Sequence, residues 1–181
     1  MITLTLGVLL WSGAHLFKRV APDARANLGE KGRGLIAATL FLSIVMMVIG
    51  YRMADGPVWW GRTPALTGIN NLLVLAAFYL FASSGMKTRV TRLTRHPQLI
   101  GFSLWAIGHL LVNGDLPSFI LFGGLLIWAI AEMTIINAQD GPYTPPHPVP
   151  IRKEAMAIVA ALVIFSLVAG LHWLLGYPPF G

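Results

Sequence analysis

Six apolar stretches dominate the sequence, and at least four of them have no polar face on the helix that they would form. They cover Ile2–Phe17, Gly34–Tyr51, Asn70–Met86, Leu99–Val112, Ser118–Ile136 and Ala155–Leu175. A helix that is apolar all round is buried in protein or in lipid, and 181 residues hold too little other protein to bury them all. Charged residues make up only 11% of the chain, compared with about 25% in a soluble domain. The sequence therefore predicts an all-α integral membrane protein: one domain over residues 1–181, with six transmembrane helices in a bundle.

Two of these stretches need comment. A membrane span takes about 20 residues, so we expect Leu99–Val112 to extend into Thr91–Gln98 or to cross a thinned region; a re-entrant segment is the alternative. The first stretch has no basic residues before it and no A-x-A cleavage site after it. We therefore interpret it as a retained span and not as a signal peptide.

The basic residues are distributed unevenly between the connecting segments. Only Arg52 and Arg62 fall on one side of the predicted bundle. The other eleven lysines and arginines lie on the opposite side: Lys18, Arg19, Arg25, Lys31, Arg33, Lys87, Arg89, Arg92, Arg95, Arg152 and Lys153. Positive residues favour the cytoplasmic side, so both termini are predicted on the outer (periplasmic) side of a bacterial inner membrane. Because this topology accounts for the net charge of +6, we expect no nucleic-acid partner.

Two connecting segments have clear turn chemistry. In Asn113–Pro117, Asn-Gly favours a tight turn, Asp115 is suited to cap the next helix and Pro117 to lie in its first turn. This predicts an antiparallel helix pair on either side of the turn. Asp140–Pro150 contains five prolines and is predicted to be extended and irregular.

The chain contains no cysteine, which excludes disulfides, thiolate zinc sites, iron–sulfur clusters and c-type haem. Histidine inside an apolar stretch is costly and points to function. His15 lies near the end of the first stretch, and Trp11 is on the same helix face, four residues earlier. A hydrogen bond to a loop is the simpler role for His15.

His109 lies deeper, inside the fourth stretch. Trp105 and Asn113 are four residues before and after it, so the three share one helix face. Gly101 and Gly108 leave room for a ligand or for a close helix. Hydrogen bonding between helices is the alternative role for this histidine.

Three further polar residues are candidates with stronger structural alternatives. His96 precedes Pro97 and suits a helix start, and His172 suits the outer interface. Glu132 is the only acid well inside a span. It is expected to pair with Arg95 or another cation, or to hold a histidine or a substrate. Two or more histidines in a cysteine-free helical bundle suggest haem b, because neutral imidazole ligates haem iron.

The sequence resembles the NnrU family of bacterial membrane proteins. The most specific part of the resemblance is Arg92–Gly101 (RLTRHPQLIG), followed by Leu104–Asp115 and Leu121–Gly124, and it extends to Gly13-Ala14-His15 and Gly34–Leu42. The resemblance implies a link to denitrification and nitric oxide metabolism. It also implies kinship with the 15-cis-zeta-carotene isomerases, which bind haem b and isomerise a polyene in a redox-dependent way.

In those isomerases the axial histidines match His15 and His109, and a further functional histidine matches His96. Another matches near Tyr51, where this chain has no histidine, so the resemblance favours haem binding over carotene isomerisation. On this basis we expect His15 and His109 to ligate the iron. Trp105, Gly101 and Gly108 would shape the pocket, and Asn113 or Glu132 would support the ligands.

Helix geometry favours a different grouping. At 1.5 Å per residue, His15 lies roughly 5 Å from the inner interface near Lys18, whereas His109 lies roughly 18 Å beyond Pro97. Depth therefore groups His15 with His96, and His109 with His172. We keep His15 and His109 as the expected pair and name His96 as the substitute ligand.

The sequence thus favours a haem b-binding membrane protein, in its enzyme form a cis–trans isomerase of a lipid-like substrate. Its expected partners are the lipid bilayer and a hydrophobic small molecule or a respiratory complex. A cofactor-free assembly or regulatory factor is the alternative. A methyltransferase using S-adenosylmethionine is a weaker one: Arg95-His96-Pro97 is similar to isoprenylcysteine carboxyl methyltransferases, but the second half of their cofactor site is missing after Glu132.

Overall fold

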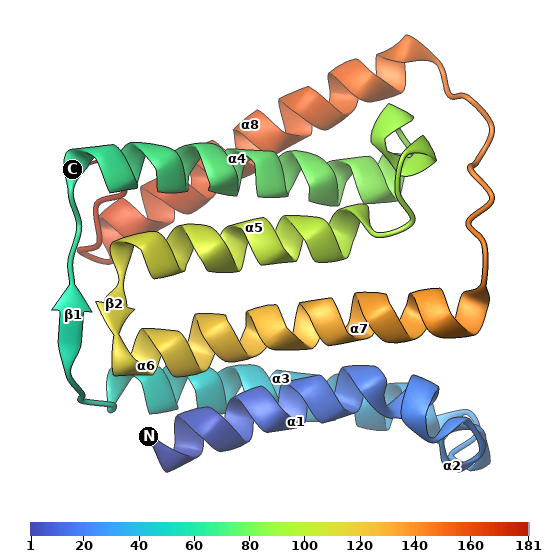
Figure 1. Cartoon of the computed structure of the whole chain (residues 1–181), viewed down its shortest axis with the longest axis horizontal. Coiled ribbons are helices and arrows are strands. Elements are labelled where there is room, and N and C mark those ends of the chain that lie inside the picture. Colours follow the sequence, from blue (N-terminus) through green and yellow to red (C-terminus); the bar gives the residue numbers. More distant parts are fainter. Residues whose placement is uncertain (181) are drawn as a thin grey trace.

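The structure is a computed structural model that describes residues 1–180, and within that range six long helices form one bundle (Figure 1). They are α1 (Ile2–Val20), α3 (Lys31–Arg52), α4 (Pro64–Met86), α5 (Pro97–Val112), α7 (Gly124–Asp140) and α8 (Ile151–Leu174). Each of the six predicted stretches overlaps one of these helices, and the all-α class is confirmed. Figure 1 shows that consecutive long helices run in opposite directions.

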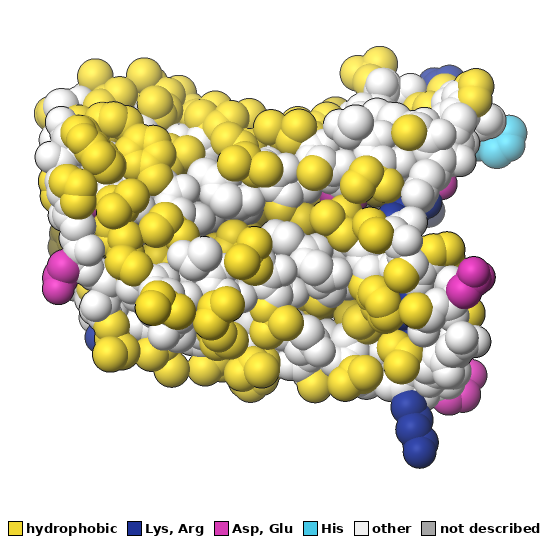
Figure 2. All heavy atoms as spheres, turned by 60° about the horizontal axis from the view of Figure 1, so that its bottom comes forward, with side chains coloured by type: hydrophobic (Ala, Val, Ile, Leu, Met, Phe, Trp, Pro, Cys, Tyr) yellow, Lys and Arg dark blue, Asp and Glu magenta, His cyan; other side chains and the backbone are white. Residues whose placement is uncertain are grey.

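Four helical segments are long and apolar enough to cross a membrane: α3, α4, the continuous stretch Leu116–Asp140 and α8. Helix α5 is apolar but shorter. Large apolar side chains stay exposed on the outward faces, and in α8 Val159 and Leu167 are 60% and 69% exposed. Figure 2 shows apolar side chains spread over the viewed face and a hollow at its right-hand end. Such a surface indicates a lipid bilayer as the surroundings.

The two ends of the bundle differ in character. Both termini lie at the end that carries β1 (Val58–Trp60) and β2 (Gly114–Asp115), which we call the sheet end (Figure 1). The opposite end carries α2 (Pro22–Asn27), η1 (Arg89–Arg92) and the proline-rich segment 141–150. Because the connections at this end hold most of the lysines and arginines, we call it the basic end.

Helix α5 is short because its start is fixed. Pro97 lies in its first turn, and the preceding His96 has a non-helical backbone. Proline suits this position, since the first turn needs no backbone N–H donor. Of the expected extension into Thr91–Gln98, the helix includes only Pro97 and Gln98, because Arg89–Arg92 forms a separate 3-10 turn. With 16 residues, α5 is about 24 Å long.

Helices α1 and α3 approach each other closely. A Cβ on Gly50 would lie 2.5 Å from the backbone nitrogen of Leu4, and a Cβ on Gly7 would lie 2.9 Å from that of Met47. Small residues at helix contacts allow this approach in membrane bundles. Leu4, Val8, Met47 and Leu125 then form a buried cluster that joins α1 and α3 to α7.

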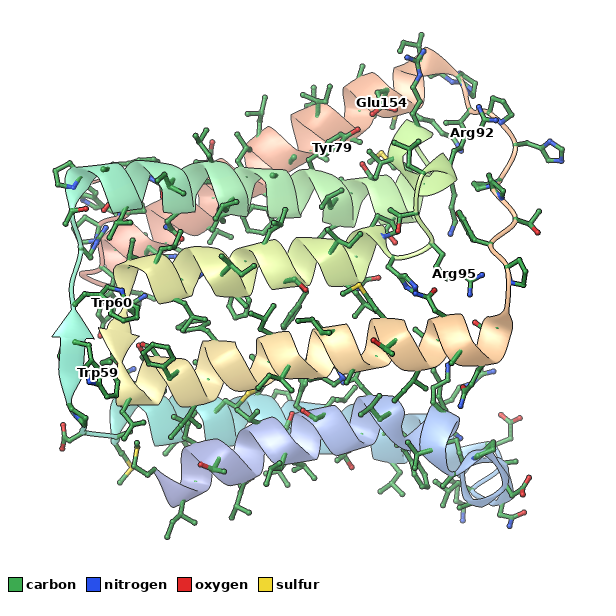
Figure 3. All side chains as sticks on the ribbon, viewed as in Figure 1. Trp59, Trp60, Tyr79, Arg92, Arg95 and Glu154 are labelled. Carbon is green, nitrogen blue, oxygen red and sulfur yellow. The ribbon has the colours of Figure 1, made fainter. Side chains whose placement is uncertain are left out.

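A two-stranded antiparallel sheet closes the sheet end, with Val58 opposite Asp115 and Trp60 opposite Gly114. The predicted cap is confirmed, since Asp115 accepts a hydrogen bond from the backbone N–H of Ser118 at 2.8 Å. The predicted tight turn at Asn113-Gly114 is wrong, because the backbone is extended there and Gly114 pairs with β1. The pairing with Val58–Trp60 was not predicted. Figure 3 shows Trp60 beside β2, where its indole N–H donates to the carbonyls of Leu110 and Leu111, both at 3.2 Å.

Below the sheet, the helix that ends as α7 begins as α6 (Leu116–Ser118) and passes through a π-helical turn, η2 (Phe119–Gly123). Such turns interrupt regular helical spacing and often occur near functional sites. Here the turn carries Phe122, whose ring stacks on His109 with centroids 4.7 Å apart.

Polar contacts tie the helices together at the basic end. Arg19 donates two hydrogen bonds to the Asp140 carboxylate, at 2.6 and 3.1 Å, which joins the ends of α1 and α7. Glu154 accepts from the Tyr79 hydroxyl and from the backbone N–H of Arg89, which joins the start of α8 to α4 (Figure 3). The segment between α7 and α8 has no helix or strand within 141–150, as predicted from its prolines.

Candidate functional site

A cavity of about 470 Å³ lies near the basic end, among α1, α4, α5 and α7. Its lining includes Trp11, His15, Arg95, His96, Trp128 and Glu132. We call it the basic-end cavity. The cavity is therefore lined by three of the candidate residues from the sequence: His15, His96 and Glu132. His15 and Glu132 come from α1 and α7, and His96 comes from the cap of α5.

His15 is held with one ring nitrogen available. Its Nδ1 lies 3.1 Å from the carbonyl oxygen of Trp11, and because a carbonyl only accepts, this bond places the proton on Nδ1. The lone pair is then on Nε2, the form in which a histidine binds a metal while its other nitrogen is anchored. The rings of Trp11 and Trp128 flank the imidazole, with centroids 4.3 and 4.7 Å away.

His96 lines the same cavity from the start of α5 and is 9% exposed. Its Nε2 lies 2.8 Å from the side-chain oxygen of Asn137 on α7. This bond uses Nε2 as a donor and leaves the lone pair on Nδ1. His96 thus joins α5 to α7 and also presents a potential ligand atom.

Glu132 and Arg95 line the cavity as unpaired charges. Glu132 is 7% exposed and its Oε2 has no hydrogen-bond partner among the described residues. The expected ion pair with Arg95 is not formed, since the one salt bridge within residues 1–180 joins Arg19 to Asp140. The reason is the orientation of Arg95, whose guanidinium turns toward the segment after α7 and donates to the carbonyl of Gly141 at 2.7 Å.

Four buried polar atoms of the cavity residues lack partners within residues 1–180. They are the indole nitrogens of Trp11 and Trp128, Nη1 of Arg95 and Oε2 of Glu132. Most buried polar groups in folded proteins are hydrogen-bonded, so each exception calls for a reason. Three N–H donors and one carboxylate oxygen around aromatic walls are suited to an apolar ligand that carries a few polar groups.

His109 lines a second, smaller cavity of about 70 Å³ nearer the sheet end, together with Asn70, Trp105 and His172. The Nδ1 atoms of His109 and His172 lie 2.9 and 2.8 Å from the carbonyls of Trp105 and Val168, four residues earlier. Both histidines therefore carry their lone pair on Nε2. The volume suits a few water molecules and not a macrocycle.

Aromatic rings fill the space between the two cavities. The ring of Phe102 lies 6.2 Å from Trp11 and 5.1 Å from Trp105, and Trp105 lies 4.9 Å from His109. His15 and His109, the pair that the resemblance implies, thus line separate cavities. The grouping predicted from depth, His15 with His96 and His109 with His172, is the one that the structure shows.

The remaining candidates lie at helix contacts. A Cβ on Gly101 would lie 2.9 Å from the carbonyl oxygen of Ala77, and one on Gly108 would lie 2.8 Å from the Asn70 side chain. These two glycines therefore let α5 pack closely on α4 and line neither cavity. Asn113 donates from its amide to the carbonyl of His109 at 2.9 Å, at the end of α5.

Among the residues that the sequence reasoning missed are Phe102 and Trp128, which line the basic-end cavity, and Asn137, which contacts His96. One of them carried a usable signal, because Trp128 lies four residues before Glu132 and so shares its helix face. Nothing in the sequence links Asn137 to His96, since their contact depends on how α5 and α7 pack.

The comparisons with known proteins give one match. A family model described as NnrU protein matches residues 3–179 of the chain. No curated protein and no solved structure matches it.

Proposed function

This chain belongs to the NnrU family, and from the residues around the basic-end cavity we propose that it is an integral membrane protein that binds haem b. In this proposal its helices make six spans of the bacterial inner membrane, with both termini outside. We also propose the role that the resemblance implies, a part in denitrification and nitric oxide metabolism.

The observation that carries the haem proposal is the setting of His15. Its Nε2 lone pair is free because Nδ1 is bonded to the Trp11 carbonyl, and the imidazole lines a cavity of about 470 Å³. Ligand pockets typically measure about 300–1,000 Å³ and have mainly apolar walls. The aromatic rings of Trp11, Phe102 and Trp128 supply such walls here.

We assign His15 as the first iron ligand and His96 as its partner across the same cavity. This choice follows the shared cavity and differs from the His15 and His109 pair that the resemblance implies. His109 lines the smaller cavity, and the rings of Phe102 and Trp105 lie between it and the space beside His15.

Bound haem would supply reversible one-electron chemistry, and the protein sets its conditions through the ligands and the dielectric. In this chain the Trp11 carbonyl orients the His15 ring, and Asn137 orients the His96 ring. The rings of Trp11, Phe102 and Trp128 supply apolar surface beside these ligands. The enzyme form of the proposal is a redox-dependent cis–trans isomerase, for which a lipid-like substrate would enter from the bilayer.

The test is an absorption spectrum of the detergent-purified full chain made in a haem-replete host, first oxidised and then reduced with dithionite. A Soret band, sharp reduced bands and near-stoichiometric haem by pyridine haemochrome are expected. A colourless protein would refute the proposal and favour the cofactor-free assembly factor. Calorimetry with S-adenosylmethionine tests the methyltransferase alternative, for which we expect no binding.

A further inference from the structure

Arg95 occupies a special place at the mouth of the basic-end cavity. It follows η1 and comes immediately before His96, and Figure 3 shows it at the end of the space between α5 and α7. Its Nη2 donates to the carbonyl of Gly141 at 2.7 Å, and its Cζ lies 5.3 Å from the centre of the Tyr143 ring. Two residues that follow α7 therefore fix the guanidinium.

These contacts leave one nitrogen of the guanidinium, Nη1, without a hydrogen-bond acceptor within residues 1–180. Nη1 is buried and has no hydrogen-bond partner among the described residues, and Arg95 lines the cavity. A buried N–H donor without a partner is costly, so this nitrogen calls for one. Gly141 and Tyr143 hold the guanidinium in place, and Arg95 has one donor left at a residue that lines the cavity.

The acid that shares the cavity lies deeper. Glu132 precedes Asp140, the last residue of α7, by eight residues, which corresponds to about 12 Å along the helix. Arg95 contacts Gly141, beyond that helix end. The cavity therefore carries its positive charge at the mouth and its negative charge farther in, with the aromatic rings of Trp11 and Trp128 along its wall.

We propose that Arg95 binds a carboxylate of the cavity's ligand, so that the ligand's acidic edge lies at the basic end and its apolar body lies among the aromatic rings. Guanidinium and carboxylate form strong charge-assisted hydrogen bonds. The inference rests on the proposed haem site, in which the propionate groups are these carboxylates. It assigns the cavity to flat apolar molecules with carboxylates on one edge.

Arg92 provides a matched control. It carries the same charge three residues earlier, on η1, and its side chain is exposed. It does not line the cavity, and Figure 3 shows it beside the segment that leads to α8. Removing its charge changes the long-range field at the basic end much as removing that of Arg95 does, but leaves the cavity wall unchanged.

The experiment compares ferric haem with its dimethyl ester, in which both propionates are blocked. The full chain is purified in detergent from a host that cannot make haem, and binding is followed by quenching of tryptophan fluorescence. We expect the wild type to bind haem roughly ten- to a hundredfold more tightly than the ester. Arg95→Gln should abolish this preference by weakening haem alone, Arg95→Lys should keep part of it, and Arg92→Gln should keep all of it.

The outcomes separate the two proposals. If the wild type binds haem and ester equally, or if Arg95→Gln keeps the preference, the role of Arg95 is overturned and the haem site stands. If the wild type binds neither compound, the haem site fails and the role of Arg95 fails with it. The wild-type comparison needs no variant, so equal binding overturns the role of Arg95 even if Arg95→Gln does not fold. In that case Arg95→Lys supplies the assignment, because the role of Arg95 requires a smaller preference in this variant than in the wild type.

Discussion

Three histidines in the bundle make the same local hydrogen bond. His15, His109 and His172 each bond through Nδ1 to the carbonyl four residues earlier in their own helix. The bond fixes the tautomer and points Nε2 away from the helix. Since the local geometry is the same, the three differ in chemistry only through their surroundings, and the largest space is beside His15.

This difference predicts the effect of single histidine substitutions on haem content. His15→Ala should lower the haem bound per protein by at least about tenfold, because the change removes a ligand in the large cavity. His109→Ala should leave it nearly unchanged. His147→Ala, in the exposed proline-rich segment, is the control, and pyridine haemochrome assay gives the content.

The same variants test the ligand pair implied by the resemblance. Equal loss of haem in His15→Ala and His109→Ala, with none in His96→Ala, would contradict our assignment. That result would mean that the aromatic rings between the two cavities rearrange when haem binds.

Replacing Glu132 is predicted to stabilise the protein. Its buried Oε2 has no partner among the described residues, and an unsatisfied buried charged group costs about 1–3 kcal/mol or more. Glu132→Gln should therefore raise the midpoint of thermal unfolding of the ligand-free protein in detergent. Asp140→Asn is the control and should lower it slightly, because Asp140 is paired with Arg19. A lower midpoint for Glu132→Gln would show that the carboxylate is satisfied.

At the scale of elements, glycines decide how closely the helices pack. On α3, Gly50 touches the backbone of α1 at Leu4, whereas Gly34 of the same helix has nothing within 4 Å of an added Cβ. One helix thus offers a matched pair of sites for the same substitution.

We expect Gly50→Ala to destabilise the protein by roughly 1–3 kcal/mol, because the added methyl group collides with backbone atoms that cannot turn aside. Gly34→Ala should stabilise it by up to roughly 1 kcal/mol, since alanine favours the helix and the site is open. Thermal unfolding in detergent measures both. Equal effects of the two changes would show that α1 and α3 do not pack as the structure has them.

At the scale of the whole molecule, the antiparallel helices place both termini at the sheet end and the basic connections at the opposite end (Figure 1). Positive residues favour the cytoplasm. The arrangement therefore agrees with an orientation in which Asp55 is outside and Glu30 is inside, and both of these acids are exposed.

The absence of cysteine makes this orientation measurable. In spheroplasts, a membrane-impermeant maleimide should label Asp55→Cys without further treatment and Glu30→Cys only after permeabilisation. The wild-type chain, which has no thiol, is the control for background labelling. The reverse pattern would invert the proposed orientation, and labelling of both sites in sealed spheroplasts would refute an odd number of spans between them.

The long helices, their order and the confirmed family can be read from the sequence, because apolar stretches, proline caps and charge placement are local properties of the chain. The sequence also placed His15 and His96 at similar depth, since depth follows from residue count along a helix. The packing of the helices is needed to see that Phe102 and Trp105 lie between His15 and His109. It is also needed to see that Arg95 donates to Gly141 and does not pair with Glu132. These contacts join residues distant in the chain, and the rotation of each helix about its axis sets them. The sheet that pairs Trp60 with Gly114 could not be predicted for the same reason. Its two strands lie about fifty residues apart in the chain, and each is too short to be recognised alone.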